Sequence, residues 1–343
     1  MANREKLEHI AKLLMAPGKG LLAADESFGT IEKRFSANGI KNTEENRRAY
    51  RQMLFTTPAI EEYISGVIMF DETARQKTSD LSMQAGGILF PEFLTGRGII
   101  PGIKVDQGLE SFNDSKVEKT TKGLETLQDR LLEYANLGLG FAKWRAVINI
   151  ENDNLPTDEC ILDGAKKLAL YALYCQEAGI VPIVESEVLM DGNHTIERCM
   201  EVTKKTLKMV FTELKNKGVY LPGMILKPNM ILSGKENSAQ ASVSEVAQKT
   251  LEVLREFVPE EVSGIAFLSG GQEDALATAR LNKMNQTKDL PWPLTFSFGR
   301  ALQDGPMKIW AGREENILQA KNEFYKLAKQ NSLASQGKYL LEA

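Results

Sequence analysis

Histidine and cysteine are scarce in this chain, and neither is spaced for a metal site or a disulfide framework. The 343 residues contain two histidines, His9 and His194, and neither has a second histidine or a cysteine at ligand spacing, so we expect no zinc site. The three cysteines, Cys160, Cys175 and Cys199, are odd in number and form no CxxC pair. This pattern indicates free thiols in a reducing compartment.

The chain also lacks a long apolar run and a surplus of basic residues. No apolar stretch approaches the roughly 20 residues of a membrane span, and the opening residues carry acidic side chains without a cleavable apolar core. The 42 Lys and Arg against 46 Asp and Glu give a net charge of −4, which excludes the basic surplus typical of nucleic-acid-binding proteins. We expect a cytoplasmic protein with neither a membrane nor a nucleic acid as partner.

What the chain has is one repeated pattern, a short apolar run that ends in polar residues and is usually followed by a longer amphipathic segment. The eight runs are 20–25, 66–71, 100–106, 141–147, 181–188, 223–230, 264–271 and 293–300. Strand then helix, eight times, predicts an α/β fold in which a parallel sheet closes into a TIM (β/α)8 barrel. An open, doubly wound sheet is the structural alternative, although it does not ordinarily need eight such strands.

Helical signals fill most of the intervals between these runs. Thr43 and Thr157 each precede two acidic residues, which is typical of a helix start, and residues 242–257 form an amphipathic segment that ends before a proline. Two intervals, 72–99 and 106–122, are rich in Gly, Ser, Thr and Asp and predict long loops with less helix.

The last part of the chain predicts one more element. Residues 314–328 form an amphipathic segment, and a polar end follows from Lys329. We find no linker and no low-complexity segment. We therefore expect a single barrel domain over residues 1–343, with a C-terminal helix and a short tail over about 314–343.

Charged or polar residues stand at the C-terminal ends of nearly all eight runs. Such residues are rare in buried strands unless they are paired, and in a (β/α)8 barrel these strand ends converge on one mouth, where the active sites of this fold lie. Three runs carry two charges at i and i+2, and because side chains alternate along a strand, each pair shares one face. The residues are Asp25, Asp71, Lys104, Asp106, Lys143, Arg145, Glu185, Glu187, Lys227, Ser269 and Arg300. They predict one shared site.

Lys227 is the candidate nucleophile. It is flanked by apolar residues, and burial together with nearby cations such as Lys143 and Arg145 would lower the pKa of its ammonium group. A neutral amine attacks carbonyl carbon, so the sequence predicts imine formation. The structural alternative is a buried ion pair between Lys227 and Glu185 or Glu187.

Proton transfer next to an imine requires carboxylates, and Asp25, Glu185 and Glu187 supply three. Crowding moves the pKa values of neighbouring carboxylates apart, so that one can donate a proton while another accepts it. The residues alone leave open which carboxylate does which.

Two segments predict phosphate binding. Ser269 precedes Gly270 and Gly271 between a strand and a helix start, where backbone N–H groups can face an anion, and Ser297 and Arg300 follow in the eighth run. The loops after strands 7 and 8 are the usual phosphate position of a barrel.

The second segment follows the first run and supplies two hydroxyls and two cations, from Ser27, Thr30, Lys33 and Arg34. Alone, this pattern is typical of a helix start with an exposed basic face. Opposite a first phosphate site, it predicts a second one. A substrate with a phosphate at each end and a carbonyl between them fits both segments.

The motifs closely resemble those of class I fructose-bisphosphate aldolase. In order they are LAADES, GIKVDQG, FAKWR, PIVESE, LKPNM, FLSGGQ and FSFGRALQ, and the resemblance extends through NTEENRRAYRQML and NSLASQGKY over almost the whole chain. It implies a lyase of glycolysis and gluconeogenesis that reversibly cleaves fructose 1,6-bisphosphate to dihydroxyacetone phosphate and glyceraldehyde 3-phosphate. It also implies a homotetramer that needs no metal and no other cofactor.

The resemblance implies a role for each matching residue. Lys227 resembles the Schiff-base lysine, Glu185 the general acid/base, and Glu187 its helper in forming and hydrolysing the imine. Asp25 resembles the carboxylate near the C4 hydroxyl, and Lys143 the cation that tunes Lys227. The positions that match the C1-phosphate site are Ser269, Gly270, Gly271, Ser297 and Arg300; those near the C6 phosphate are Ser27, Thr30, Lys33 and Arg34; Lys104 and Arg145 stand beside Lys143.

Two features depart from the family pattern. The usual VEPE is VESE here, with Ser186 in place of proline, which should loosen the backbone slightly without moving the carboxylates off one face. Animal members continue past GKY to a terminal tyrosine that helps protonate the enamine, whereas Tyr339 matches the GKY tyrosine. We expect slower enamine protonation here, or a different group in that role.

Three alternatives remain beside this interpretation. Another imine-forming sugar-phosphate enzyme, such as a transaldolase or a deoxyribose-phosphate aldolase, is disfavoured by the two phosphate sites. A metal-dependent aldolase is the second alternative. The third comes from another class, a binding or scaffold protein on an aldolase fold, and an intact set of Lys227, Glu185 and Asp25 argues against it as the sole role.

Overall fold

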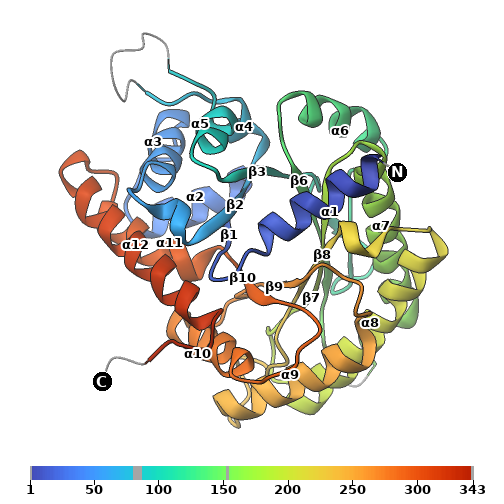
Figure 1. Ribbon diagram of the computed structural model, residues 1–343. Helices are drawn as coiled ribbons and strands as arrows, with labels where there is room; N and C mark the ends of the chain where they lie inside the picture. Colours follow the sequence, from blue (N-terminus) through green and yellow to red (C-terminus); the bar gives the residue numbers. More distant parts are fainter. Residues whose placement is uncertain (1, 80–86, 152–153, 341–343) are drawn as a thin grey trace.

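Eight parallel strands close into a barrel in the computed structural model, which describes residues 2–79, 87–151 and 154–340 (Figure 1). The strands are β1 (Gly20–Ala24), β2 (Ile64–Met69), β3 (Ile100–Lys104), β6 (Phe141–Ile148), β7 (Val181–Val188), β8 (Ile225–Pro228), β9 (Ile265–Phe267) and β10 (Leu294–Phe298). Each overlaps one of the eight predicted runs. Because β1 pairs with both β2 and β10, the ring has no edge. The TIM barrel prediction is confirmed, and the open-sheet alternative is wrong.

Helices surround the ring of strands, as Figure 1 shows. They are α2 (Phe28–Ala37), α3 (Glu44–Phe55), α4 (Asp71–Arg75), α5 (Phe90–Gly96), α6 (Leu127–Asn136), α7 (Asp158–Glu177), α8 (Ile196–Asn216), α9 (Val243–Phe257), α10 (Asp274–Asn285) and α11 (Arg300–Trp310). The predicted helix starts are confirmed, since the hydroxyls of Thr43, Thr157 and Ser242 each accept a hydrogen bond from the backbone N–H three residues along. None of the described helices is long and apolar enough to cross a membrane.

The two intervals predicted to hold less helix do so. Within 72–99 lie most of the short α4 and all of α5, while residues 80–86 fall outside the described part of the chain. Residues 106–122 form a small antiparallel hairpin of β4 (Leu109–Ser111) and β5 (Lys119–Thr121). Short 3-10 turns, η1 (Ile60–Glu62) and η2 (Leu221–Gly223), precede β2 and β8.

The C-terminal helix is longer than predicted. A 3-10 turn, η3 (Glu314–Asn316), leads into α12 (Ile317–Ala334), so the expected end at residue 328 is wrong. The segment beyond it reads as a polar tail because it contains Asn331 and Ser332, but both are buried. Asn331 accepts a hydrogen bond from Thr278, and Ser332 donates to the carbonyl of Gly18. Both polar side chains thus form hydrogen bonds inside the protein, and the helix extends past residue 328 to include them.

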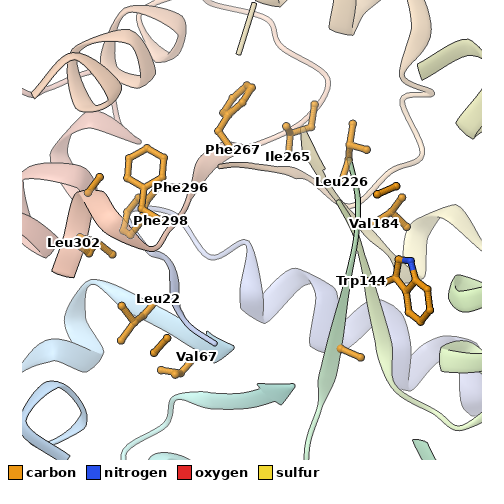
Figure 2. Packing of buried hydrophobic residues seen from close by; sticks show 14 of the residues in the cluster. Leu22, Val67, Trp144, Val184, Leu226, Ile265, Phe267, Phe296, Phe298 and Leu302 are labelled. Atoms are coloured by element: carbon orange, nitrogen blue, oxygen red, sulfur yellow. The ribbon is translucent and has the colours of Figure 1, made fainter. Parts of the chain in front are cut away.

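The barrel separates two apolar cores because side chains alternate along each strand. Outward-facing residues such as Trp144, Val184 and Leu226 pack between the strands and the helices, and Figure 2 shows them on the outer side of the ring. Inward-facing residues form a second cluster. Its strand members include Leu21, Ile68, Phe141, Val181, Ile183, Ile225 and Ala266.

Helix α1 (Ala2–Leu14), which was not predicted, closes one end of the barrel. It lies across the ring in Figure 1, and Leu7, Ala11 and Leu14 belong to the inward-facing cluster. Gly66 of β2 faces Leu14 closely enough that a Cβ there would stand 2.6 Å from its Cδ2 atom. The N-terminal ends of the strands are thus filled with apolar side chains, which leaves the C-terminal ends for the site.

Candidate active site

A cavity of about 400 Å³ lies at the C-terminal ends of the barrel strands. Fifteen of the sixteen predicted site residues line it: Asp25, Ser27, Thr30, Lys33, Arg34, Lys104, Lys143, Arg145, Glu185, Glu187, Lys227, Ser269, Gly270, Ser297 and Arg300. The sixteenth, Gly271, lies beside this set, because a Cβ on it would stand 3.2 Å from Nη2 of Arg300. The structure therefore brings the predicted residues to one mouth.

The strands hold the central charged groups side by side. Lys143, Glu185 and Lys227 each follow, by two positions, an apolar residue of the inward-facing cluster, so they point into the barrel one layer nearer the mouth. The register pairs Arg145 with Glu185, and Glu185 with Lys227, across neighbouring strands. The spacing of two residues on one strand and the register between strands together fix the site.

Glu185 lies between two ammonium groups. Its Oε1 is 3.1 Å from Nζ of Lys227, and its Oε2 is 3.2 Å from Nζ of Lys143. Lys143 also reaches Oδ2 of Asp25 at 2.8 Å and Oδ2 of Asp106 at 3.8 Å. Only 3% of the Lys227 surface is exposed, so water screens these pairs weakly. Acids and ammonium groups alternate from Asp25 through Lys143 and Glu185 to Lys227.

Burial and the neighbouring ammonium groups shift the pKa values of the acids in opposite directions. Burial raises the pKa of Asp25, but Lys143 and Lys227 outweigh it and bring the pKa to about 2. Burial raises the pKa of Glu185 as well, and the same two lysines make the net shift a lowering. Burial lowers the pKa of Lys143, whereas Asp25 and Glu185 raise it above its ordinary value. At neutral pH both acids are carboxylates that can accept a proton.

The sequence predicted cations around Lys227, but the group that contacts its amine in the structure is a carboxylate. It contacts the Glu185 carboxylate, which is the ion pair that the structural alternative required. Both residues nevertheless line the cavity instead of lying in an apolar core. The pair therefore places a proton acceptor directly beside the amine, at a position open to a substrate.

The second carboxylate of β7 is held by a different cation. Arg145 donates from Nε to Oε2 of Glu187, and Lys104 donates from Nζ to Oδ1 of Asp106 at 2.5 Å. Burial lowers the pKa of Arg145, but Glu187 raises it further, so this guanidinium stays charged. Glu185 and Glu187 share a face of β7 but have separate partners, because Lys143 and Lys227 contact Glu185 and Arg145 contacts Glu187.

The segment after β9 forms a turn suited to an anion. The backbone N–H of Gln272 donates to the carbonyl of Ser269 at 2.9 Å, and Gly270 and Gly271 both have positive φ, at 51° and 87°. On the neighbouring strand β10, the hydroxyl of Ser297 is buried and has no hydrogen-bond partner among the described residues. An unsatisfied buried hydroxyl beside a glycine turn fits a ligand with acceptor oxygens.

Arg300 stands over this turn at the start of α11. Among the residues that the structure describes, no carboxylate forms an ion pair with it. Its charge is therefore available to a phosphate on the substrate. Lys33, on the helix that follows β1, likewise has no ion-pair partner within the described chain.

The wall that follows β1 contains the second predicted phosphate segment. Because β1 pairs with β10, this wall lies beside the segment of Ser297 and Arg300, so the predicted position opposite it is wrong. The hydroxyls of Ser27 and Thr30 lie 3.2 Å apart. Arg34, however, is already paired, because its guanidinium contacts Glu26 and lies 2.7 Å from Oδ1 of Asp304. A phosphate at this wall must share or displace these carboxylates to contact Arg34.

Sequence reasoning missed two members of this wall. Glu26 lines the cavity and holds Arg34, and its Oε2 also lies 2.5 Å from Nη2 of Arg51. Glu26 directly follows the predicted Asp25, so its place at the strand end was a usable signal. Arg51 is buried in the middle of α3, and an arginine among other helical arginines gives no such signal.

A neighbouring cavity of about 720 Å³ adjoins the first, and Ser27, Thr30, Lys104 and Arg145 line both. Asp71, which the sequence grouped with the central charges, lines this neighbour and not the central cavity. It pairs with Arg75 at 2.9 Å and accepts a hydrogen bond from Tyr134 at 2.9 Å. Asp71 begins α4 instead of ending β2, which points it away from Lys227.

Tyr339 lies far from the mouth. Asn282, near the end of α10, binds its backbone twice, accepting from the N–H at 2.9 Å and donating to the carbonyl at 3.0 Å. Since α10 begins beside the phosphate turn and runs away from it, its last turn is at the other end of the barrel.

Comparisons with known proteins agree on one family. The family model for fructose-bisphosphate aldolase class-I, a glycolytic family, matches residues 6–343. The chain is 51% identical to a probable fructose-bisphosphate aldolase class 1 of Xanthomonas axonopodis pathovar citri over 98% of each chain. It is 48% identical to the fructose-bisphosphate aldolase of Echinococcus multilocularis, over 98% of this chain and 91% of the relative.

Solved structures extend the likeness to three dimensions. Fructose-bisphosphate aldolase from Plasmodium falciparum, in a ternary complex with TRAP and a small-molecule inhibitor, matches with a TM-score of 0.96 and 44% identity. The match covers 100% of this chain and 97% of that one. The identities, the coverage and the shared barrel lead to one conclusion: this chain belongs to the class-I fructose-bisphosphate aldolase family and is a lyase.

Proposed function

We propose that this chain cleaves fructose 1,6-bisphosphate reversibly to dihydroxyacetone phosphate and glyceraldehyde 3-phosphate through an imine on Lys227. The observation that carries the proposal is the contact between Lys227 and Glu185 on the cavity wall, with Nζ and Oε1 3.1 Å apart. A lysine that attacks a carbonyl must first lose a proton. Glu185 is the carboxylate positioned to take it.

The first half of the reaction forms the imine. Glu185 accepts a proton from Lys227, and the free amine attacks C2 of the ketose. One proton of the attacking nitrogen passes to the C2 oxygen, which gives a neutral carbinolamine. Glu185 then returns its proton to that hydroxyl, which leaves as water, and the C2=N bond forms as an iminium. Lys143, held as a cation by Asp25 and Glu185, stabilises the oxygen while it carries negative charge. Glu187 assists the proton transfers from the same face.

The second half breaks the carbon–carbon bond. Asp25, a carboxylate with a pKa near 2, accepts the proton of the C4 hydroxyl. The C4–O bond becomes a carbonyl, the C3–C4 bond breaks, and its electron pair moves through C2 to the iminium nitrogen. The aldehyde leaves as glyceraldehyde 3-phosphate. Protonation of the enamine at C3 and hydrolysis of the iminium release dihydroxyacetone phosphate.

The phosphates anchor the substrate across the mouth. The Ser269–Gly270–Gly271 turn, with Ser297 and Arg300, would bind the C1 phosphate, because the buried Ser297 hydroxyl and the unpaired Arg300 charge both require an acceptor. The C6 phosphate would lie against Ser27, Thr30, Lys33 and Arg34. Lys104 on β3 and Arg145 on β6 line the cavity from the other side of the ring.

The remaining proposals concern the whole protein. We take residues 1–343 as one barrel domain with a C-terminal helix and a short tail. We propose that the protein is located in the cytoplasm and that it forms a homotetramer. The tetramer comes from the family resemblance, and the cytoplasmic location comes from the spacing of the three cysteines and the lack of a long apolar run in the sequence. Analytical ultracentrifugation of the purified chain tests the tetramer, and a sedimenting mass near that of one 38.1 kDa chain would contradict it.

Chemical trapping tests the reaction. The protein is incubated with dihydroxyacetone phosphate, reduced with borohydride, digested, and analysed by mass spectrometry. We expect one adduct, on Lys227, formed equally well in EDTA. A different labelled lysine, or cleavage of fructose 1,6-bisphosphate that requires a divalent metal, would contradict the proposal. Turnover of the bisphosphate separates this activity from transaldolase and deoxyribose-phosphate aldolase activities.

A further inference from the structure

Arg280 is a buried cation for which the reaction scheme gives no role. It lies in α10 with 6% of its surface exposed, and its Nε has no hydrogen-bond partner in the described part of the chain. Among the described residues, no carboxylate forms an ion pair with it, and Glu273, the acid that acts on it from a distance, is exposed. Burial accordingly lowers the pKa of this guanidinium. A buried charge without a partner destabilises the folded state.

One contact of Arg280 leads toward the mouth. Its Nη1 donates to Oε1 of Gln272 at 2.8 Å, and the backbone N–H of Gln272 closes the turn over Ser269 at 2.9 Å. The two residues inside the turn, Gly270 and Gly271, have no side chains to fix its shape. The Gln272 side chain is therefore the brace between this turn and the body of α10.

The electrostatics of this corner are also unbalanced. The Arg280 side chain runs back along α10 to a residue that precedes the helix, so its charge lies near the end where backbone N–H groups are unpaired. Arg300 meets the other side of the turn at Gly271. Two guanidiniums and a helix N-terminus thus surround one short turn, and a bound anion would compensate all three.

We propose that Arg280 is a positioning residue for the phosphate-binding turn: it holds the turn in shape through Gln272 and places positive charge behind it, at a cost to the stability of the free protein. The proposal rests on the proposed function, because it takes the turn to bind the C1 phosphate of dihydroxyacetone phosphate. Arg280 itself does not touch the substrate.

The variant Arg280→Met keeps most of the bulk and removes the charge and the hydrogen bond. We expect the KM for dihydroxyacetone phosphate in the condensation reaction to rise about fivefold, the size of one lost hydrogen bond. The KM for glyceraldehyde 3-phosphate and kcat should change less than about twofold. The thermal midpoint should stay equal or rise, since a costly buried charge is gone. If Arg280 had only a structural role, Arg280→Met would instead lower the thermal midpoint and cause no selective change in KM.

Two further variants test the route through Gln272. Gln272→Ala should raise the KM for dihydroxyacetone phosphate by no more than Arg280→Met does, and the double variant should match Arg280→Met, because both changes remove the same brace and only Arg280→Met also removes the charge. Additive effects would overturn the route. Arg280→Lys, which keeps the charge, should restore part of the affinity, and a KM equal to that of Arg280→Met would overturn the electrostatic part.

Thr278→Val is the matched control. It removes a buried hydrogen bond to Asn331 from the same helix, two residues from Arg280, without touching the turn. We expect a lower thermal midpoint and unchanged KM values. If Thr278→Val raises the KM for dihydroxyacetone phosphate as Arg280→Met does, general damage to α10 explains both and the proposal is overturned.

Borohydride trapping of dihydroxyacetone phosphate on the wild-type protein keeps the two proposals apart. If the wild type forms no adduct on Lys227, the proposed function fails and this inference fails with it. If the wild type forms the adduct and Arg280→Met binds dihydroxyacetone phosphate as tightly as the wild type, only the positioning role is overturned. A selective rise in KM, with trapping still on Lys227, supports both.

Discussion

The two ends of the barrel interior are built from the same strands and have opposite chemistry. On β6, β7 and β8 the inward-facing residues Phe141, Ile183 and Ile225 belong to an apolar cluster that α1 covers. Two positions further along each strand stand Lys143, Glu185 and Lys227, which carry charge and line the cavity. One step of the strand repeat, roughly 7 Å, separates a core from a reaction site.

The difference teaches how a folded protein tolerates such a site. The apolar layer gains stability from burial, whereas the charged layer costs desolvation that its ion pairs offset only in part. The charged layer can therefore change without loss of the fold, and the apolar layer cannot. Variants at the two ends should separate activity from stability.

Lys227→Met should have the largest effect on the charged layer. Loss of the nucleophile should lower kcat by about 10⁴-fold or more, because the amine that attacks C2 is gone. The thermal midpoint should fall only slightly, since methionine fills the space and Lys143 still contacts both Glu185 and Asp25. Steady-state kinetics and calorimetry measure both. Retained turnover would assign the chemistry to another residue.

Phe141→Ala should have the largest effect on the apolar layer. Its ring fills the space beside Gly66 and Gly102, which have no side chains, so truncation leaves a cavity and should destabilise the protein by about 3–5 kcal/mol. Urea unfolding measures this change. The folded fraction should keep kcat within a few-fold. A large loss of kcat with normal stability would show that the two layers are not independent.

Asp25 links the site to pH. Its pKa is about 2 in the folded protein and near 3.9 in an unfolded chain, so the folded state gains about 2 kcal/mol from this ionisation at neutral pH. That gain is complete above about pH 4 and is lost as the pH falls toward 2. Asp25→Asn should therefore flatten the pH dependence of unfolding free energy between pH 4 and 2. An unchanged slope would mean that Lys143 and Lys227 do not lower this pKa.

Arg300→Ala should have the smallest effect. Loss of one guanidinium from the phosphate turn should raise KM for the bisphosphate about tenfold and leave kcat nearly unchanged, provided that Arg300 binds ground and transition states alike. Lys308→Ala is the control, since it removes one exposed charge from the same helix. Equal KM values for both variants would remove Arg300 from the phosphate site.

The fold and most of the cavity could be predicted because they follow from short-range periodicity. Glu185 and Glu187 share a face for the same reason that eight apolar runs form eight strands, and parallel strands bring their ends together. Asp71 was wrongly grouped with them, because the sequence does not show that it begins a helix instead of ending a strand.

Other residues gave no periodic signal. Arg51 and Arg280 look like ordinary surface positions of amphipathic helices, and their burial depends on which helices pack together. Asn331 looks like part of a polar tail for the same reason. Helix α1 was missed because its partner is the inside of a barrel end that exists only after closure. In all four cases, the position in the fold depends on contacts between elements that are far apart in the sequence.

The seam between β1 and β10 has a consequence for biosynthesis. Leu21 is in register with Ser297, and Thr295 donates a hydrogen bond to the carbonyl of Lys19 across 276 positions of sequence. The barrel therefore cannot close until nearly all of it has left the ribosome, and pairing over such a separation is slow. Until the barrel closes, the apolar inward-facing residues of the nascent chain are exposed to water and to neighbouring chains. We therefore expect chaperones to govern the yield of folded protein more than its final stability does.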